Sequence, residues 1–174
     1  MKRIAILILA AAWLAPLCLD VSAQARKRVP RFEDYPVKEI FQGKNAALAL
    51  ETPEQQNSII YYQAIADGGT NFAGHYAVVP LTCGKDCIAA DYLDLRTGKI
   101  ISGEFVNSGW KEHHDAFREM EFRRGSRLIV FAGQIDRKGP NGWHFYVFDD
   151  GKLKRIHTIA TSGDFRKPLT DWMK

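Results

Sequence analysis

The sequence lacks the short motifs by which common enzyme classes are identified. It contains no Gly-x-Ser-x-Gly nucleophile elbow, no His-Glu-x-x-His zinc motif and no phosphate-cradling glycine loop. A large excess of charge of one sign is also missing, because 24 Lys and Arg residues stand against 20 Asp and Glu residues. So small a net positive charge does not indicate nucleic acid as a partner. It supports at most a slight preference for anionic envelope material.

The beginning of the chain is typical of an exported protein. A short basic start precedes an almost wholly apolar run over residues 4–19, which is too short to span a bilayer comfortably. We therefore predict that residues 1–23 are a signal peptide, cleaved near Ala23 or Ala25, and that the mature protein is periplasmic or secreted. The basic run 26–28 leaves an alternative open, in which the apolar segment stays uncleaved and anchors the chain to the membrane.

Cysteine is scarce, with three residues in the chain, and Cys18 would be removed with the signal peptide. The remaining pair, Cys83 and Cys87, lies close together in a chain that we expect to enter an oxidising compartment, which favours a disulfide. A thioredoxin-like pair would have two intervening residues instead of three, and a zinc site would need two further ligands. We predict a structural disulfide that shapes a turn and contributes only about 2 kcal/mol, with redox and metal-binding roles as alternatives.

The mature chain is long enough for one domain with a sizeable core. We divide it into an irregular N-terminal arm (24–52), a single β-rich domain (53–165) and a C-terminal tail (166–174). The arm contains two prolines and, near residues 46–50, one candidate short strand.

One helix is predicted over residues 53–66. Thr52-Pro53-Glu54 combines an N-cap residue, a proline at the first helical position and an early acid. Ile59, Tyr62 and Ala66 recur at helical spacing, which predicts that they form the buried face. Two consecutive glycines follow and end the helix.

After the helix, the pattern changes to strands and turns. We predict strands at 76–81, 88–95, 100–105, 127–135, 143–148 and 153–160, and a loop over 106–118. Two strands, 127–135 and 143–148, are apolar on both faces and should be central, whereas 153–160 is more polar and suits an edge. The expected fold class is α+β, mainly β: an antiparallel meander of about six or seven strands with one helix packed on it.

The densest group of candidate residues is Asn-Phe-Ala-Gly-His-Tyr at positions 71–76. Together with Cys-Gly-x-x-Cys from Cys83 and the strand that closes on Asp-x-Arg-Thr-Gly-Lys (94–99), it resembles a group of small exported bacterial proteins of uncharacterised function. The resemblance covers roughly residues 35–160. Such proteins often carry Trp-Gly where this chain has Leu81-Thr82. The resemblance implies a fold and a compartment, and it implies no activity.

Several residues of this central segment are candidates for a site. His75 could act as a base or a ligand, although a histidine beside glycines more often makes a structural hydrogen bond. Asn71 could bind a ligand or cap a turn, and Tyr76, which directly follows His75, is a further binding candidate. Asp91 interrupts an apolar strand, so it needs a partner if it is buried.

A second group of candidate residues lies in the predicted loop. His113, His114 and Asp115 are weak candidates for metal ligands, because adjacent histidines point in different directions.

Trp110 and Trp143 could stack on sugars, although an aromatic residue in a half-buried sheet usually belongs to the core.

The leading functional prediction is a non-catalytic binding module for a protein or a cell-envelope ligand, of the inhibitor or immunity type, with no cofactor and no nucleic-acid partner. One alternative is a small periplasmic hydrolase that uses His75 with Asp91 or Asp115, which would require these groups to meet within hydrogen-bond reach. The other alternative is a metal-sequestering protein. In this prediction, a membrane is a partner only through an uncleaved signal segment.

Overall fold

A computed structural model describes residues 28–174, so the predicted signal peptide and its cleavage sites lie outside the described residues. The main sheet has eight strands, in the order β1-β2-β4-β7-β8-β9, with β3 beside β2 and β6 beside β7. All pairings in this sheet are antiparallel, which confirms the predicted mainly antiparallel α+β fold. The strands are β1 (Tyr76–Thr82), β2 (Cys87–Asp94), β3 (Ile100–Ile101), β4 (Asn107–Ser108), β5 (Glu112–His113), β6 (Met120–Phe122), β7 (Leu128–Ile135), β8 (Gly142–Asp149), β9 (Lys152–Ala160) and β10 (Asp164–Phe165).

The helices are short: η1 (Phe32–Asp34, a 3-10 turn), α1 (Pro53–Asn57), α2 (Ile59–Asp67) and α3 (Leu169–Trp172). The single helix predicted over 53–66 is therefore divided. Thr52 caps α1 as expected, because its side chain accepts a hydrogen bond from the Gln55 amide. At Ser58 the backbone leaves helical geometry, with φ −104° and ψ 14°, and α2 begins at the next residue.

One predicted strand and one predicted loop need correction. The predicted strand 100–105 ends at Ile101, and the Gly103 amide instead donates a hydrogen bond to the Asp91 carboxylate. The predicted loop 106–118 contains β4, which lies between β2 and β7, and β5, which pairs with β10 in a separate two-stranded sheet. The predicted edge position of 153–160 is confirmed, since β9 ends the strand order.

The sheet folds over itself, so the molecule is layered. One face of β1 and β2 packs against one face of β7 and β8, and this central core includes Phe72, Tyr92, Phe131 and Phe148. Helix α2 covers the outer face of β1 and β2 with Tyr62 and Ala66. The outer face of β7 and β8 is covered by residues from both chain ends, among them Phe32, Phe165 and Leu169. Each sheet layer thus buries both faces.

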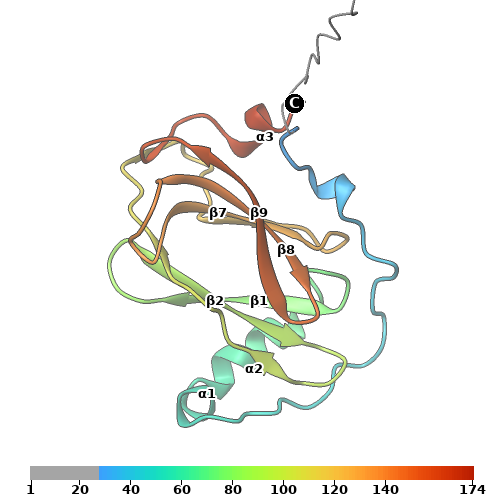
Figure 1. Ribbon diagram of the computed structural model, residues 1–174. Coiled ribbons are helices and arrows are strands. Elements are labelled where there is room, and N and C mark those ends of the chain that lie inside the picture. Colours follow the sequence, from blue (N-terminus) through green and yellow to red (C-terminus); the bar gives the residue numbers. More distant parts are fainter. Residues whose placement is uncertain (1–27) are drawn as a thin grey trace, which may run out of the picture.

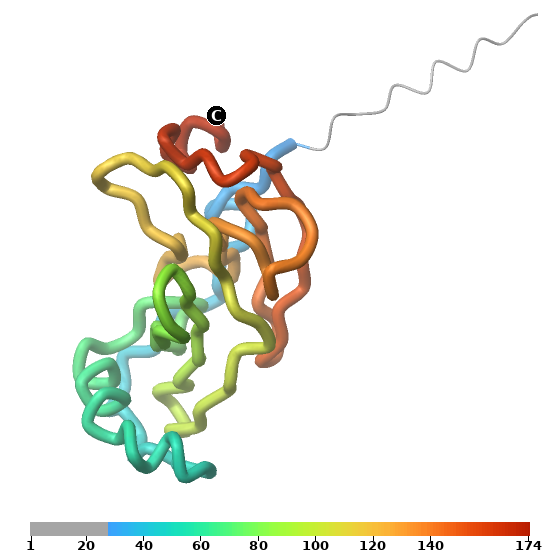
Figure 2. The backbone as a smooth tube through the Cα atoms, turned by 90° about the vertical axis from the view of Figure 1, so that its left-hand side faces the viewer, coloured from blue at the N-terminus to red at the C-terminus, as the bar shows by residue number. Residues whose placement is uncertain are grey.

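The described chain is elongated, as Figures 1 and 2 show, with α1 and α2 at one end and the C-terminal segment at the other. The N-terminal arm runs along one side from the C-terminal end to the helices (Figure 1). Along this path Phe32 enters the core under β7 and β8, and Leu48 and Leu50 pack beside α2. In residues 28–174, no helix is long and apolar enough to cross a membrane.

Candidate functional site

The segment 71–76 forms a tight turn that joins the helical end to β1. The side-chain oxygen of Asn71 accepts a hydrogen bond from the Val78 amide at 2.8 Å, and the Asn71 and Phe72 amides both donate to the Tyr76 carbonyl at 3.0 Å. Gly74 has φ +81°, and a Cβ there would lie 2.4 Å from the Glu39 carbonyl oxygen. Asn71 therefore caps the turn, and position 74 requires glycine for both its backbone conformation and its close approach.

His75 is held by two charged neighbours from the turn that follows β2. A terminal guanidinium nitrogen of Arg96 lies 2.6 Å from His75 Nε2, and Asp94 Oδ2 lies 4.0 Å from the same nitrogen. Because a guanidinium can only donate, Nε2 accepts this hydrogen bond and the imidazole is neutral. Burial lowers the pKa of His75, the Asp94 carboxylate opposes that shift, and the Arg96 cation adds to it.

A pocket of about 510 Å³ opens beside this ring, and His75, Arg96, Lys38, Glu39 and Arg127 are among its lining residues. Both of its arginines are paired with carboxylates. Arg127 pairs with Asp149 at 3.1 Å, and the Arg96 Nε lies 3.6 Å from Asp94. The lone pair of His75 Nε2 is occupied, so this ring does not present a base to the pocket.

Replacing Arg96 by glutamine should raise the pKa of His75. The substitution removes a cation that lowers this pKa and leaves the Asp94 carboxylate that raises it. The measurement is an NMR titration of the His75 ring, with His144 as the internal reference, because its ring bonds to Gly133 and Thr158 elsewhere in the sheet. An unchanged or lowered His75 pKa in Arg96→Gln would contradict the contact between the Arg96 guanidinium and His75 Nε2.

Asp91 lies away from His75. It is 6% exposed, and its carboxylate accepts hydrogen bonds from the Tyr62 hydroxyl at 2.6 Å and the Gly103 amide at 3.1 Å. The strand register places Asp91 opposite Val79, four residues or roughly 13 Å along the strand from His75. The carboxylate therefore ties helix α2 to the sheet, and the structure does not bring the two candidate catalytic groups together.

The cluster His113, His114 and Asp115 lies at and after β5. The His113 ring stacks on Phe117, with ring centroids 5.0 Å apart, and Asp115 is exposed in the turn that follows. Within the described part of the chain, no three His, Cys, Asp or Glu side chains are grouped so that they could hold a metal ion. Asp115 is also not among the charged groups that shift the pKa of His75, so the structure does not bring these two candidates together.

The aromatic candidates have packing partners in the fold. The Trp110 indole nitrogen donates to the Ala132 carbonyl at 2.7 Å, and Trp143 is buried with its ring centroid 5.0 Å from that of Phe165. Tyr76 packs edge-on against Phe148 at 4.8 Å. These contacts are those of core residues.

The predicted disulfide between Cys83 and Cys87 is confirmed, with a Cα–Cα distance of 5.1 Å. It closes the turn between β1 and β2, where the Cys83 amide also donates to the Cys87 carbonyl at 3.2 Å. The crosslink therefore fixes the end of the β1–β2 hairpin, next to the last residues of β1.

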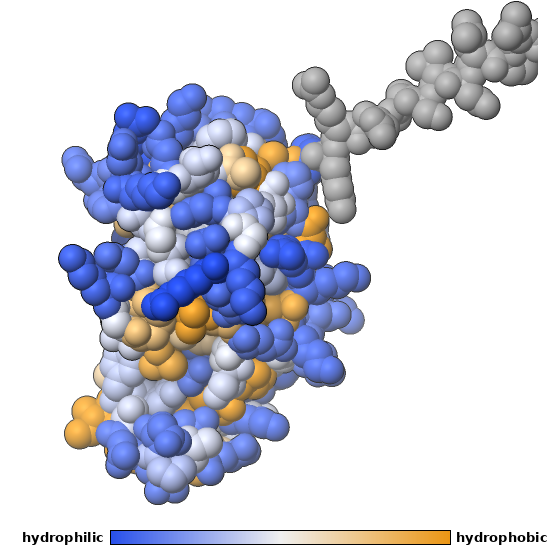
Figure 3. All heavy atoms as spheres, turned by 60° about the vertical axis from the view of Figure 1, so that its left-hand side comes forward, coloured by the Kyte–Doolittle hydropathy of each residue, from blue (hydrophilic) through white to orange (hydrophobic). Residues whose placement is uncertain are grey.

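A groove that the sequence did not reveal runs between α2 and the end of β1. Its volume is about 760 Å³, and all of its lining residues are uncharged: Asn57, Ser58, Ile60, Tyr61, Ala64, Pro80, Leu81 and Thr82. Four large hydrophobic residues are exposed in the described chain, and three of them begin α2: Ile59 (47%), Ile60 (84%) and Tyr61 (41%). In Figure 3, hydrophobic residues reach the surface in patches over the middle and lower part of the molecule. Clustered exposure of this kind marks interaction surfaces.

The exposure of Ile59 corrects its predicted place on the buried face of the helix. Tyr62 and Ala66 are buried as predicted, whereas Ile59 and the neighbouring Ile60 are exposed to solvent. The sequence did carry a signal, the consecutive apolar residues Ile59 and Ile60. A helix that buries a single apolar stripe needs only one of two adjacent residues to be apolar.

The free edge of β1 beside the groove is closed to an added strand. The Val78 amide bonds to Asn71, Pro80 has no amide hydrogen, and the Pro80 carbonyl accepts a hydrogen bond from the Tyr61 hydroxyl at 2.7 Å. What the groove offers is therefore side-chain surface and not backbone hydrogen bonds.

No protein-family model, curated protein or solved structure matches this chain.

Proposed function

We propose that the protein is a non-catalytic binding module that acts after export, and that it binds a partner protein through the groove between α2 and β1. One observation carries this proposal: three exposed large hydrophobic residues gather at the start of α2, beside an uncharged groove. Burying such residues against a partner is favourable by roughly 25 cal/mol for each Å² of apolar surface removed from water.

The lining of the groove indicates the kind of partner segment that fits. With no charged side chain in the wall, a charged group would lose its hydration without gaining an ion pair. The closed edge of β1 disfavours an extended strand as the docking element. We therefore expect an uncharged, apolar face of a helix or loop from the partner.

Two further features support a binding role. The His75 ring is bonded to Arg96 and the buried Asp91 carboxylate to Tyr62, so the two groups serve separate contacts within the fold and do not form an acid–base pair. Leu81 and Thr82, which directly precede the disulfide, both line the groove, so we expect them to contribute to the choice of partner.

Photocrosslinking in cells that produce the protein tests the proposal. A photoreactive residue at Ile60 should give one discrete product with a second protein, and the same residue at the exposed Lys154 of β9 should not. Introducing Ala64→Arg in the same chain should remove the product, because it puts a charge into the uncharged wall. A product that persists with Ala64→Arg, a product of twice this chain's mass, or no product from position 60 would each contradict the proposal.

A further inference from the structure

A pocket of about 440 Å³ lies between the turn after β7 and the first half of strand β9. It shares no lining residue with the α2–β1 groove or with the pocket beside His75. Its volume falls within the usual range for small-molecule sites. The lining residues that bear on its chemistry are Asp136, Lys138, Pro140, Tyr146, Leu153 and Arg155.

A tight turn holds the polar residues on one side of this pocket. Asp136 and Arg137 both have positive φ, +50° and +58°, and the Lys138 amide donates to the Ile135 carbonyl at 2.8 Å. The Asp136 amide donates to the Val106 carbonyl at 2.8 Å, and the Val106 amide donates to Asp136 Oδ1 at 3.0 Å. The turn is therefore tied to the chain just before β4. Within residues 28–174, Asp136 Oδ2 has no hydrogen-bond partner, so this oxygen can accept a bond from a ligand.

Tyr146 and Arg155 form the other side of the pocket. They lie directly opposite each other in the β8–β9 pair, so their side chains lie on the same face of the sheet. Tyr146 is 6% exposed, and its ring centroid is 5.0 Å from that of Phe105. Burial raises the pKa of Tyr146, and the charge and a hydrogen bond of Arg155 act against that shift. Because a guanidinium can only donate, the hydroxyl accepts this bond and keeps its own O–H for another partner.

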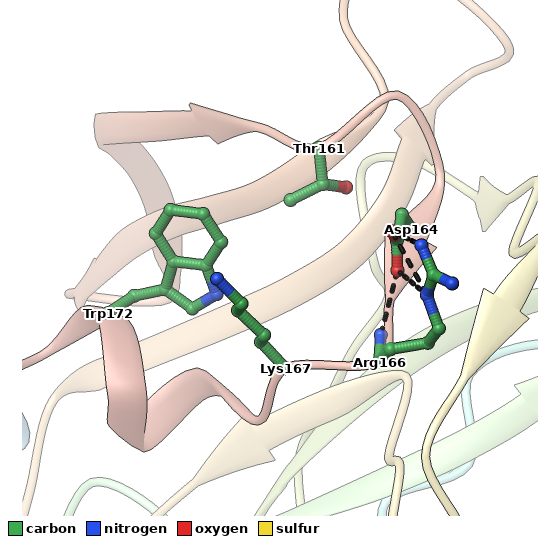
Figure 4. Close-up of a pocket in the computed structure, with 5 residues that line it drawn as sticks. All are labelled: Thr161, Asp164, Arg166, Lys167 and Trp172. Atoms are coloured by element: carbon green, nitrogen blue, oxygen red, sulfur yellow. Dashed lines mark hydrogen bonds and ion pairs between the residues drawn. The ribbon is translucent and has the colours of Figure 1, made fainter.

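The two cations of this pocket have no carboxylate partner. Neither Lys138 nor Arg155 forms a salt bridge with any residue that the structure describes. The pocket at the C-terminal end, drawn in Figure 4, is different. There Arg166 is bonded to Asp164, as the dashed lines show, and also lies 3.2 Å from the Glu112 carboxylate. The anion-binding groups that remain unused are thus those of Lys138 and Arg155.

The pocket combines three donors with one acceptor. The guanidinium of Arg155, the ammonium of Lys138 and the hydroxyl of Tyr146 suit a carboxylate, and two of these bonds would be charge-assisted. The free oxygen of Asp136 suits a hydroxyl group and repels a second negative charge. The ligand that fits this set carries one carboxylate together with hydroxyl groups.

We propose that this pocket binds a sugar acid, whose carboxylate accepts hydrogen bonds from Arg155, Lys138 and Tyr146. A hydroxyl group of the sugar donates to Asp136 Oδ2. Pro140 supplies an apolar wall for one face of the sugar ring. The site shares no residue with the α2–β1 groove, so the proposal does not depend on the proposed partner protein.

The test is an NMR titration of the backbone amides with glucuronate, at constant ionic strength. The amide of Gly139, in the pocket wall, should shift saturably, and that of Gly69, just after helix α2, should not. Glucose lacks the carboxylate and acetate lacks the hydroxyl groups, so each should bind at least about tenfold more weakly than glucuronate. Glucose 6-phosphate is the fourth probe, and its expected binding is weaker than that of glucuronate, because its second negative charge meets Asp136.

Variants of strand β9 make the assignment residue-specific. Arg155→Gln should weaken glucuronate binding about tenfold, as expected for the loss of a charge-assisted hydrogen bond. Lys154→Gln is the matched control and should leave the affinity unchanged. Adjacent residues of a strand point to opposite faces, and Lys154 does not line the pocket, so its charge serves only to protect the edge strand. Both side chains are exposed, so the folded state should tolerate both replacements.

Four results would each overturn the proposal. They are a Gly139 amide that does not respond to glucuronate, glucose or acetate binding as tightly as glucuronate, equal losses of affinity in Arg155→Gln and Lys154→Gln, and tighter binding of glucose 6-phosphate. The last result would replace the carboxylate assignment with a phosphate one.

Discussion

Replacing Phe72 by alanine is expected to lower the free energy of unfolding by about 3–5 kcal/mol, the usual cost of removing a large buried aromatic side chain. Phe72 is 0% exposed and lies in the central core between the two sheet layers. Its ring contacts those of Tyr92, Phe122 and Phe148, with centroid distances of 6.0, 6.1 and 5.3 Å. The cavity left by alanine would lie where the two layers meet.

Chemical denaturation followed by circular dichroism measures this effect. Phe72→Leu is the matched control, because it keeps most of the buried volume and should cost less than half as much as alanine. A loss below about 1 kcal/mol in Phe72→Ala would show that the turn 71–76 does not anchor the core.

The expected result bears on how the segment Asn71–Tyr76 is interpreted. The sequence marks it as dense in residues that can perform chemistry, and the structure gives most of them a role in folding. Asn71 caps the turn, Phe72 fills the core, Gly74 permits a close approach and Tyr76 packs on Phe148. The geometry of the turn and the packing of the core thus account for these four residues.

The parts of the fold that were predicted correctly depend on local patterns. The long strands β1, β2, β7, β8 and β9 carry clear apolar runs bounded by turn residues, and the disulfide follows from two cysteines four positions apart. The two-residue strands β4 and β5 are too short for a period to appear, so they were predicted as loop. Their pairing is decided by strands distant in the sequence.

The contacts that define the candidate sites are also distant in the sequence. The sequence indicates that Asp91 needs a partner if buried, but the partner, Tyr62, is 29 residues away. The groove includes Ile60, and its exposure depends on which parts of the chain pack against the start of α2, which composition does not reveal. The helical spacing of apolar residues identifies those that lie on one face of a helix. It does not show which of them another part of the chain will cover.

Replacing Ala64 by arginine is expected to weaken the binding of the partner protein by at least about a hundredfold, the effect of losing a well-packed contact at an interface centre. Ala64 lines the groove and is exposed, so the new side chain occupies the groove without disturbing the core. Arginine is also a good helix former, so α2 should keep its stability. The melting temperature of Ala64→Arg should therefore stay close to that of the original protein.

The most direct measurement is the dissociation constant of the crosslinked partner for three proteins: the original chain, Ala64→Arg and His75→Ala. Binding through the uncharged groove predicts a hundredfold loss in Ala64→Arg, a change of less than about threefold in His75→Ala, and little dependence on salt concentration. The opposite pattern, with binding lost in His75→Ala, retained in Ala64→Arg and weakened steeply by salt, would contradict the groove as the binding site and return the function to the His75 pocket.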